Sequence, residues 1–132
     1  MGERVWLAVA AALGLVAVAA GAFGAHGLEA AGNAQGAELV ATGSRYQMWH
    51  ALAILACALA NRCYLPALWL WAIGAVLFPF SLYGLALGAP RALAMLAPVG
   101  GTALLLGWAA LAWYAVRAPA AAPPAAGTRP GR

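Results

Sequence analysis

The chain has 132 residues, of which 66% are hydrophobic and only 8% charged, with a mean hydropathy of +0.86. This length is enough for one domain. A soluble domain carries about 25% charged residues, so the composition excludes an ordinary water-soluble protein and indicates one that faces the lipid bilayer. The net charge of +4 sits mostly near the chain ends, which gives no support to nucleic-acid binding.

The first predicted element is a membrane-spanning helix over residues 5–25. This stretch carries no charge, and at ~1.5 Å per residue it can cross ~30 Å of hydrocarbon. A cleaved signal peptide is the alternative, because the small residues around Ala19 and Ala22 resemble cleavage sites. The long apolar run and the cancelling charges of Glu3 and Arg4 favour the span. Small residues recur along it at a spacing that allows close helix packing: Gly14, Ala17, Gly21 and Ala25.

Residues 29–44 form a short polar, amphipathic segment, with a turn signal at Gly32 and Asn33. Helix is expected again from residue 37, which gives a second span over residues 37–60. On a helical wheel at ~100° per residue, most polar groups of this span share one band of about 80°. The band consists of Gly43, Gln47, His50, Ile54, Cys57 and Asn61. Because unpartnered polar groups are costly in lipid, this stripe is predicted to face the other helices.

The third predicted span covers residues 66–88 and contains an internal proline, Pro79. Proline lacks the N–H that would bond the preceding turn, so a kink is expected there. The hydroxyl of Ser81 is expected to help satisfy the backbone near the kink. Gly84 and Gly88 are spaced as a small-residue packing motif.

The fourth predicted span covers residues 98–116 and begins with Pro98, with three glycines forming a close-packing face: Gly100, Gly101 and Gly107. The expected fold class is therefore all-α, a four-span transmembrane helical bundle over residues 1–117. Residues 118–132 are rich in Ala and Pro and cannot form a core, which predicts a disordered cytoplasmic tail.

The arginines predict the orientation of such a bundle in the membrane. With four spans, one side holds Arg4, Arg62, Arg117, Arg129 and Arg132, and the other holds Arg45 and Arg91. Cytoplasmic loops carry the excess of positive charge. Both termini are therefore expected in the cytoplasm, with the protein in the inner membrane.

Several runs resemble the YgdD-like small inner-membrane proteins, a family of unknown function with four predicted spans. The run of residues 21–28, Gly-Ala-Phe-Gly-Ala-His-Gly-Leu, is the most specific of these. The residues that carry the resemblance are Gly21, Phe23, Gly24, His26, Gly27, Tyr46, Gln47, His50, Pro98, Gly100, Gly101, Gly107 and Trp108. The resemblance covers about residues 5–116. It implies the four-span topology and the importance of the two histidines, and it implies no activity.

His26 and His50 are the main candidates for functional chemistry. His26 is expected ~31 Å along the first span, and His50 ~15 Å from the inner end of the second. A shared metal ion is excluded at that separation unless the first span bends, since metal–imidazole bonds are ~2.0–2.1 Å. No catalytic residue or metal site is predicted, and Cys57 and Cys63 are interpreted as reduced, inert thiols.

Two interpretations of His50 remain open. It could be a neutral imidazole whose hydrogen bonds hold the helices in register, or part of a proton, quinone or haem site together with Gln47. His26 is expected to cap a helix end, followed by Gly27 in the left-handed conformation. The function predicted is a non-enzymatic structural or accessory component that contacts lipid and assembles with itself or with a larger membrane complex. The alternative is a conduit that uses His50, with haem or quinone as its cofactor.

Overall fold

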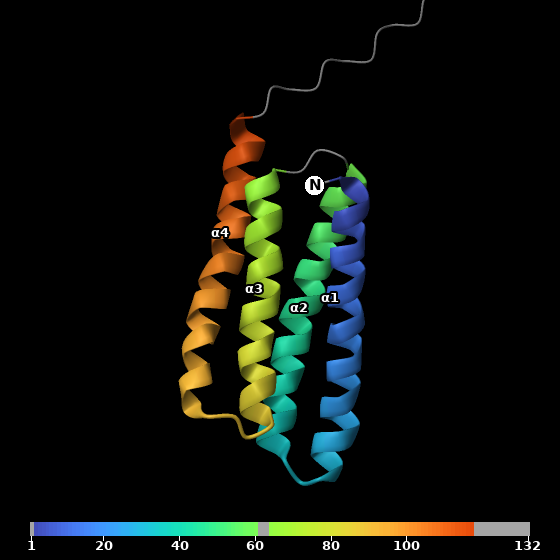
Figure 1. The fold of residues 1–132 in the computed structure, drawn as a ribbon, viewed down its shortest axis with the longest axis vertical. Coiled ribbons are helices and arrows are strands. Elements are labelled where there is room, and N and C mark those ends of the chain that lie inside the picture. Colours follow the sequence, from blue (N-terminus) through green and yellow to red (C-terminus); the bar gives the residue numbers. More distant parts are fainter. Residues whose placement is uncertain (1, 61–63, 118–132) are drawn as a thin grey trace, which may run out of the picture.

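The computed structural model describes residues 2–60 and 64–117, and within them every regular element is helical. Four long helices run alternately down and up the molecule (Figure 1): α1 (Glu3–Phe23), α2 (Ala34–Ala60), α3 (Leu65–Ala86) and α4 (Leu96–Arg117). The predicted all-α, four-helix architecture is confirmed. The predicted tail over residues 118–132 and Asn61 of the predicted stripe lie outside the described residues.

Two short helices extend the long ones. The π-helical turn Gly24–Leu28 continues α1 directly, and the 3₁₀ turn Arg91–Met95 leads into α4. The left-handed conformation expected at Gly27 is wrong, because the π-turn carries the helix past it. Gly32, with φ of 75°, makes the turn instead. Its lack of a Cβ allows this conformation where the chain reverses into α2.

Three helical segments are long and apolar enough to cross a membrane: Glu3–Leu28, Leu65–Ala86 and Arg91–Arg117. The remaining long helix, α2, has 27 residues and matches them in length but is more polar. It packs against both α1 and α3. Of the predicted stripe on α2, four members are buried: Gly43, Gln47, His50 and Ile54. The prediction that this face of α2 points toward the other helices is therefore confirmed for them.

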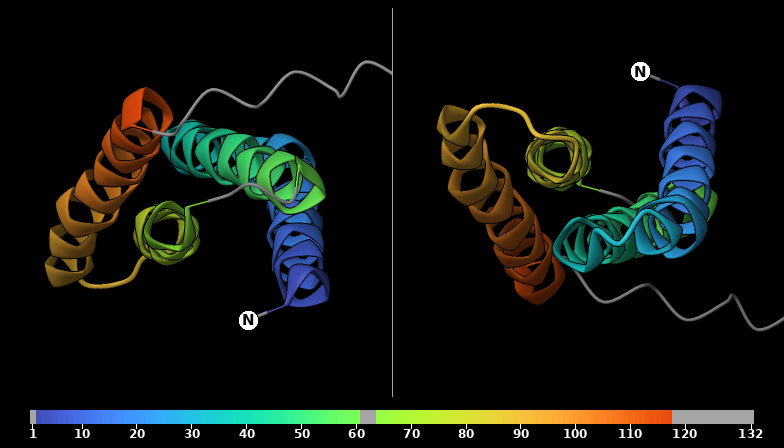
Figure 2. Two further views of the ribbon diagram at one scale, coloured as in Figure 1. Left: turned by 90° about the horizontal axis from the view of Figure 1, so that it is seen from above. Right: turned by 90° about the horizontal axis from the view of Figure 1, so that it is seen from below.

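The helices form an open arc. Each helix packs mainly on the next one in the sequence, and α1 makes few contacts with α3. In the end-on views, α1 and α3 both lie on the same side of α2, and α4 lies on the side of α3 that faces away from α1 (Figure 2). The chain therefore has two different sides, one formed by the outer face of α2 and one where α1 and α3 flank its inner face.

Glycines bring α3 and α4 into close contact. A Cβ on Gly100 would overlap the backbone of Phe78, and one on Gly107 would overlap the ring of Trp71. The predicted close-packing face of α4 is confirmed at these two positions. It is not confirmed at Gly101, where an added Cβ would lie 3.8 Å from its nearest neighbour, the ring of Phe78. The packing motif predicted at Gly88 is wrong, because this residue adopts a φ of 86° and lies beyond the end of α3.

Pro79 lies inside α3 without interrupting it. The helix is continuous from Leu65 to Ala86, and end-on it projects as a single ring (Figure 2), so the expected kink is not seen. The hydroxyl of Ser81 donates a hydrogen bond of 2.8 Å to the carbonyl of Phe78. Ser81 therefore bonds the backbone next to the proline, as expected. Its acceptor is the carbonyl three residues back, one helical turn away.

Candidate functional site

The imidazole of His50 is held at both nitrogens. Its Nδ1 lies 2.7 Å from the carbonyl oxygen of Tyr46, and the indole Nε1 of Trp108 donates to its Nε2 over 3.1 Å. Because Nε2 accepts a hydrogen bond, it carries no hydrogen of its own. The hydrogen is therefore on Nδ1, which donates to the carbonyl oxygen of Tyr46. The ring is therefore a neutral imidazole of defined tautomer. The hydrogen bond from Trp108 ties α2 to α4.

An aromatic cluster surrounds this imidazole. The rings of Trp71 and Trp108 lie 4.7 Å apart between centroids, and the imidazole of His50 lies 6.4 Å and 6.1 Å from them. His50 is only 5% exposed, and Trp71 is completely buried. Trp108 is 48% exposed, so the site is buried on the side of Trp71 and reaches the surface at Trp108.

A second polar pair joins α2 to α3. The hydroxyl of Tyr83 donates a 2.8 Å hydrogen bond to Oε1 of Gln47, whose side chain is 4% exposed. The bond uses the only proton of the phenol and fixes the orientation of the glutamine amide. Sequence reasoning missed the roles of Tyr83 and Trp108. Both are amphipathic aromatics on apolar helices, a residue type that seeks a hydrogen-bond partner when buried.

The structure does not bring the two histidines together. His26 lies in the π-turn at the loop end of α1 and is exposed, whereas His50 is buried near the middle of α2. Across residues 2–60 and 64–117, no three His, Cys, Asp or Glu side chains lie close enough to hold a metal ion. His26, His50 and Gln47 therefore do not form one common site.

The remaining polar residues are the cysteines and the charged side chains of α2. Cys57 is disulfide-bonded, so its interpretation as a reduced thiol is wrong, and Cys63 lies outside the described residues. Glu38 and Arg45 are both exposed on the outer face of α2. Neither Glu38 nor Arg45 forms an ion pair within the described part of the chain.

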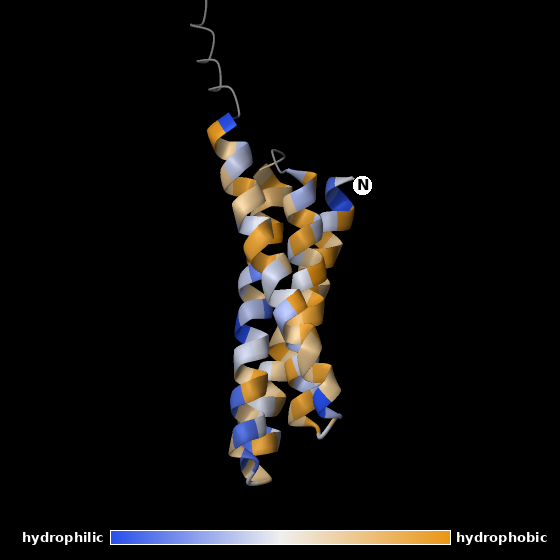
Figure 3. Cartoon of the chain, turned by 90° about the vertical axis from the view of Figure 1, so that its left-hand side faces the viewer, coloured by the Kyte–Doolittle hydropathy of each residue, from blue (hydrophilic) through white to orange (hydrophobic). Residues whose placement is uncertain are grey.

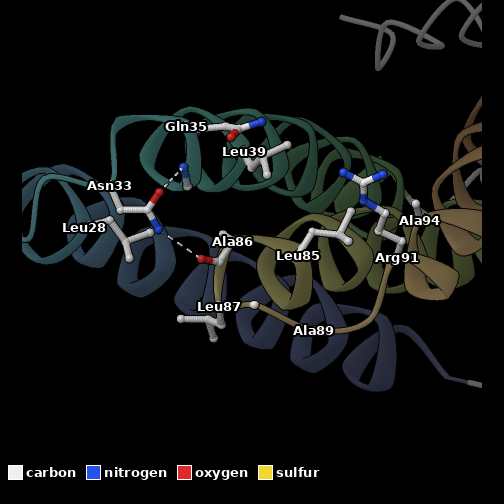
Figure 4. Close-up of a pocket in the computed structure, with 12 residues that line it drawn as sticks. Leu28, Asn33, Gln35, Leu39, Leu85, Ala86, Leu87, Ala89, Arg91 and Ala94 are labelled. Atoms are coloured by element: carbon white, nitrogen blue, oxygen red, sulfur yellow. Dashed lines mark hydrogen bonds between the residues drawn. The ribbon is translucent and has the colours of Figure 1, made fainter.

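A cavity of about 900 Å³ opens at the loop end of the bundle, between the start of α2 and the turn before α4. Leucines line its middle, with Asn33 at one end and Arg91 at the other (Figure 4). Asn33 caps α2 by accepting a 2.9 Å bond from the Gly36 amide, and its Nδ2 donates to the carbonyl of Ala86 over 3.2 Å. This asparagine therefore connects the first turn of α2 to the last turn of α3.

Fold and site together define a small polytopic helical membrane protein, in which hydrogen bonds of Gln47 and His50 join α2 to its neighbours. The family described as "Protein of unknown function (DUF423)" matches residues 20–101. The chain belongs to this family, which confirms the resemblance drawn from its motifs.

Relatives in several bacteria match most of the chain. The UPF0382 inner membrane protein YgdD of Escherichia coli K12 is 42% identical over 122 residues, covering 89% of this chain and 93% of the relative. A UPF0382 membrane protein of Haemophilus influenzae is 40% identical over 112 residues, covering 82% and 90%. One of Staphylococcus epidermidis is 36% identical, covering 82% and 92%. No solved structure matches the chain significantly.

Proposed function

We propose that this protein is a non-enzymatic accessory component of the inner membrane, which assembles with another transmembrane protein through the outer face of α2. The observation that carries the proposal is the position of Arg45. This side chain is exposed on α2 at the level of Phe78 and Pro79, inside the apolar length of α3, where a charge facing lipid is unfavourable.

The depth of Arg45 follows from its neighbours. The ring of the next residue, Tyr46, lies 5.2 Å from that of Phe78, and Gly43 lies against Pro79. Pro79 precedes the end of α3 by seven residues, or ~10 Å of helix at ~1.5 Å per residue. If the apolar length of α3 spans the hydrocarbon layer, Arg45 therefore lies ~10 Å inside that layer. A charged residue at the centre of a spanning helix costs ~2.5–3.5 kcal/mol in insertion experiments.

The charge pattern indicates what kind of surface covers this face. Glu38 and Arg45 lie on one face of α2, and hydrophilic residues gather along the lower half of this helix (Figure 3). In a symmetric pair of copies inserted in the same direction, Arg45 would face its own counterpart. A surface of complementary charge, on another protein or on a different face of a second copy, fits better.

The test is purification in mild detergent with mass analysis of every co-eluting protein, for the wild type, Arg45→Leu and the control Arg91→Leu. We expect a stoichiometric partner or oligomer with the wild type and the control, and its loss with Arg45→Leu. A wild-type protein that elutes as a clean monomer would contradict the proposal. So would an assembly that survives Arg45→Leu, since Arg45 would then act as an interfacial anchor whose side chain reaches toward the headgroups.

The second candidate, a conduit through His50, is favoured by the burial of this ionisable side chain inside a membrane helix. Two points weaken it. Both ring nitrogens are already bonded, so a proton relay must first break a hydrogen bond, and neither nitrogen is free as an axial ligand for haem. It is tested by proton flux in liposomes, which His50→Ala should abolish while the protein stays in the membrane.

A further inference from the structure

The inner face of α2 holds a second feature, independent of the partner surface. A cavity of about 240 Å³ lies between α1 and α3, with Gln47 of α2 lining it. The other lining residues are Ala12, Leu13, Val16, Val76, Phe80 and Tyr83. The flanking side chains of Val16, Val76 and Phe80 are about half exposed, so the cavity opens sideways toward the acyl chains.

The amide of Gln47 is incompletely bonded. Its Oε1 accepts the proton of Tyr83, but its Nε2 has no hydrogen-bond partner in the described part of the chain. The side chain is 4% exposed and lines the cavity. An amide donor that is left unsatisfied away from water costs ~1–3 kcal/mol. The cavity walls are mostly apolar, and the amide of Gln47 presents an N–H donor to them that has no acceptor among the described residues.

The surroundings restrict the acceptor. Every lining residue besides Gln47 and Tyr83 is apolar and none is charged, so an anionic ligand would be unpaired there. The cavity lies about halfway along α1 and beside the second half of α3. Its donor, Gln47, lies at the middle of α2, thirteen residues or ~20 Å of helix from either end. The donor is therefore away from the headgroup level where phospholipid ester carbonyls reside. The volume of the cavity is below the ~300–1,000 Å³ of typical ligand pockets, which suits a single ring and excludes a macrocycle such as haem.

We propose that this groove binds the head group of a lipid-soluble quinone, with one quinone carbonyl accepting a hydrogen bond from Nε2 of Gln47. The ring lies against the aliphatic walls and Phe80, and the isoprenoid tail leaves through the lateral opening into the bilayer. The Tyr83 hydroxyl occupies Oε1 of the amide, which leaves the N–H₂ group to bond the ligand. The inference concerns binding alone and does not depend on the α2 partner surface.

The experiment uses the full chain in phosphatidylcholine nanodiscs with decylubiquinone as the probe. Two quantities are measured: the saturable binding affinity, and the infrared stretching frequency of the bound quinone carbonyls. With the wild type, we expect one quinone carbonyl to stretch at a lower frequency than in the free quinone, because a hydrogen bond weakens the C=O bond. Gln47→Leu should weaken binding about tenfold, the effect of one lost hydrogen bond, and restore the free carbonyl frequency. Gln35→Leu, the same substitution at the exposed start of α2, is the matched control and should bind like the wild type.

A second variant keeps the test decisive if Gln47→Leu fails to fold. Ala12→Phe fills the groove from α1 while Gln47 and Tyr83 themselves stay unchanged, and it should abolish binding. The inference is overturned if the wild type shows no saturable binding, or if Ala12→Phe binds as the wild type does. It is also overturned if decylbenzene, which lacks a carbonyl, displaces the probe with equal affinity, because the groove would then hold only acyl chains.

Discussion

The hydrogen bonds at His50 illustrate how single polar residues act in a protein whose residues are 66% hydrophobic. Ala, Leu and Val packed against each other in lipid gain little specificity, since the acyl chains are as apolar as they are. The hydrogen bond between Trp108 and His50 requires a limited range of distances and angles, so it restricts the rotation and depth of α4 relative to α2. The bond between Tyr83 and Gln47 does the same for α3 and α2.

The first prediction concerns Trp108→Phe. This change keeps an aromatic ring but removes the donor to His50, leaving a buried imidazole nitrogen without a partner. We expect a loss of ~1–3 kcal/mol in the free energy of unfolding, measured by denaturant titration in detergent micelles. Trp49→Phe is the control, because Trp49 is half exposed and a phenylalanine retains its ring contact with Tyr46. Equal stability of the two variants would show that the bond contributes nothing to holding the helices.

Among the elements, the α3–α4 pair depends most on small residues. Gly74 of α3 lies against Leu104 and the carbonyl of Gly100, and Gly100 lies against the backbone of Phe78. Backbone atoms cannot rotate away as a side chain can. A methyl group added at this crossing therefore has to separate the helices.

The second prediction compares Gly100→Ala with Gly101→Ala on adjacent positions of α4. Alanine favours helix over glycine by ~1 kcal/mol at both, but only at Gly100 does its methyl overlap the backbone of Phe78. We expect Gly100→Ala to destabilise the protein by ~1–3 kcal/mol, the usual range for overpacking, and Gly101→Ala to be neutral or slightly stabilising. Thermal unfolding in detergent measures both. Equal melting temperatures for Gly100→Ala and Gly101→Ala would show that the close contact with Phe78 does not limit the packing of α4.

The sequence was sufficient to predict the helices and the buried stripe of α2, because hydrophobic runs and a ~100° periodicity are local properties. It could not predict the partners of His50 and Gln47. Trp108 is 58 residues from His50 and Tyr83 is 36 from Gln47, so each pairing depends on how two separate helices pack. The π-turn at Gly24–Leu28 was missed for the opposite reason, since one extra residue in a turn changes no hydrophobic pattern.

At the scale of the whole molecule, the polarity of α2 follows from its central place. It contacts both α1 and α3, so one face is covered by protein, and polar groups there can be bonded. Its outer face retains Glu38 and Arg45, which lowers its overall apolarity below that of the other three long helices.

The third prediction tests whether α2 crosses the bilayer. It has 27 residues, which corresponds to ~40 Å at ~1.5 Å per residue, and it runs opposite to α1 and α3 (Figure 1). Four crossings put both termini on one side, and the arginine bias makes that side the cytoplasm. Three crossings would put the termini on opposite sides.

We expect green fluorescent protein, which fluoresces only when fused on the cytoplasmic side, to be bright at either terminus. Alkaline phosphatase, active only outside, should be active when fused after Gly88, in the turn between α3 and α4. Opposite results at the two termini would show that α2 lies at the surface, and its buried polar pairs would then need another explanation.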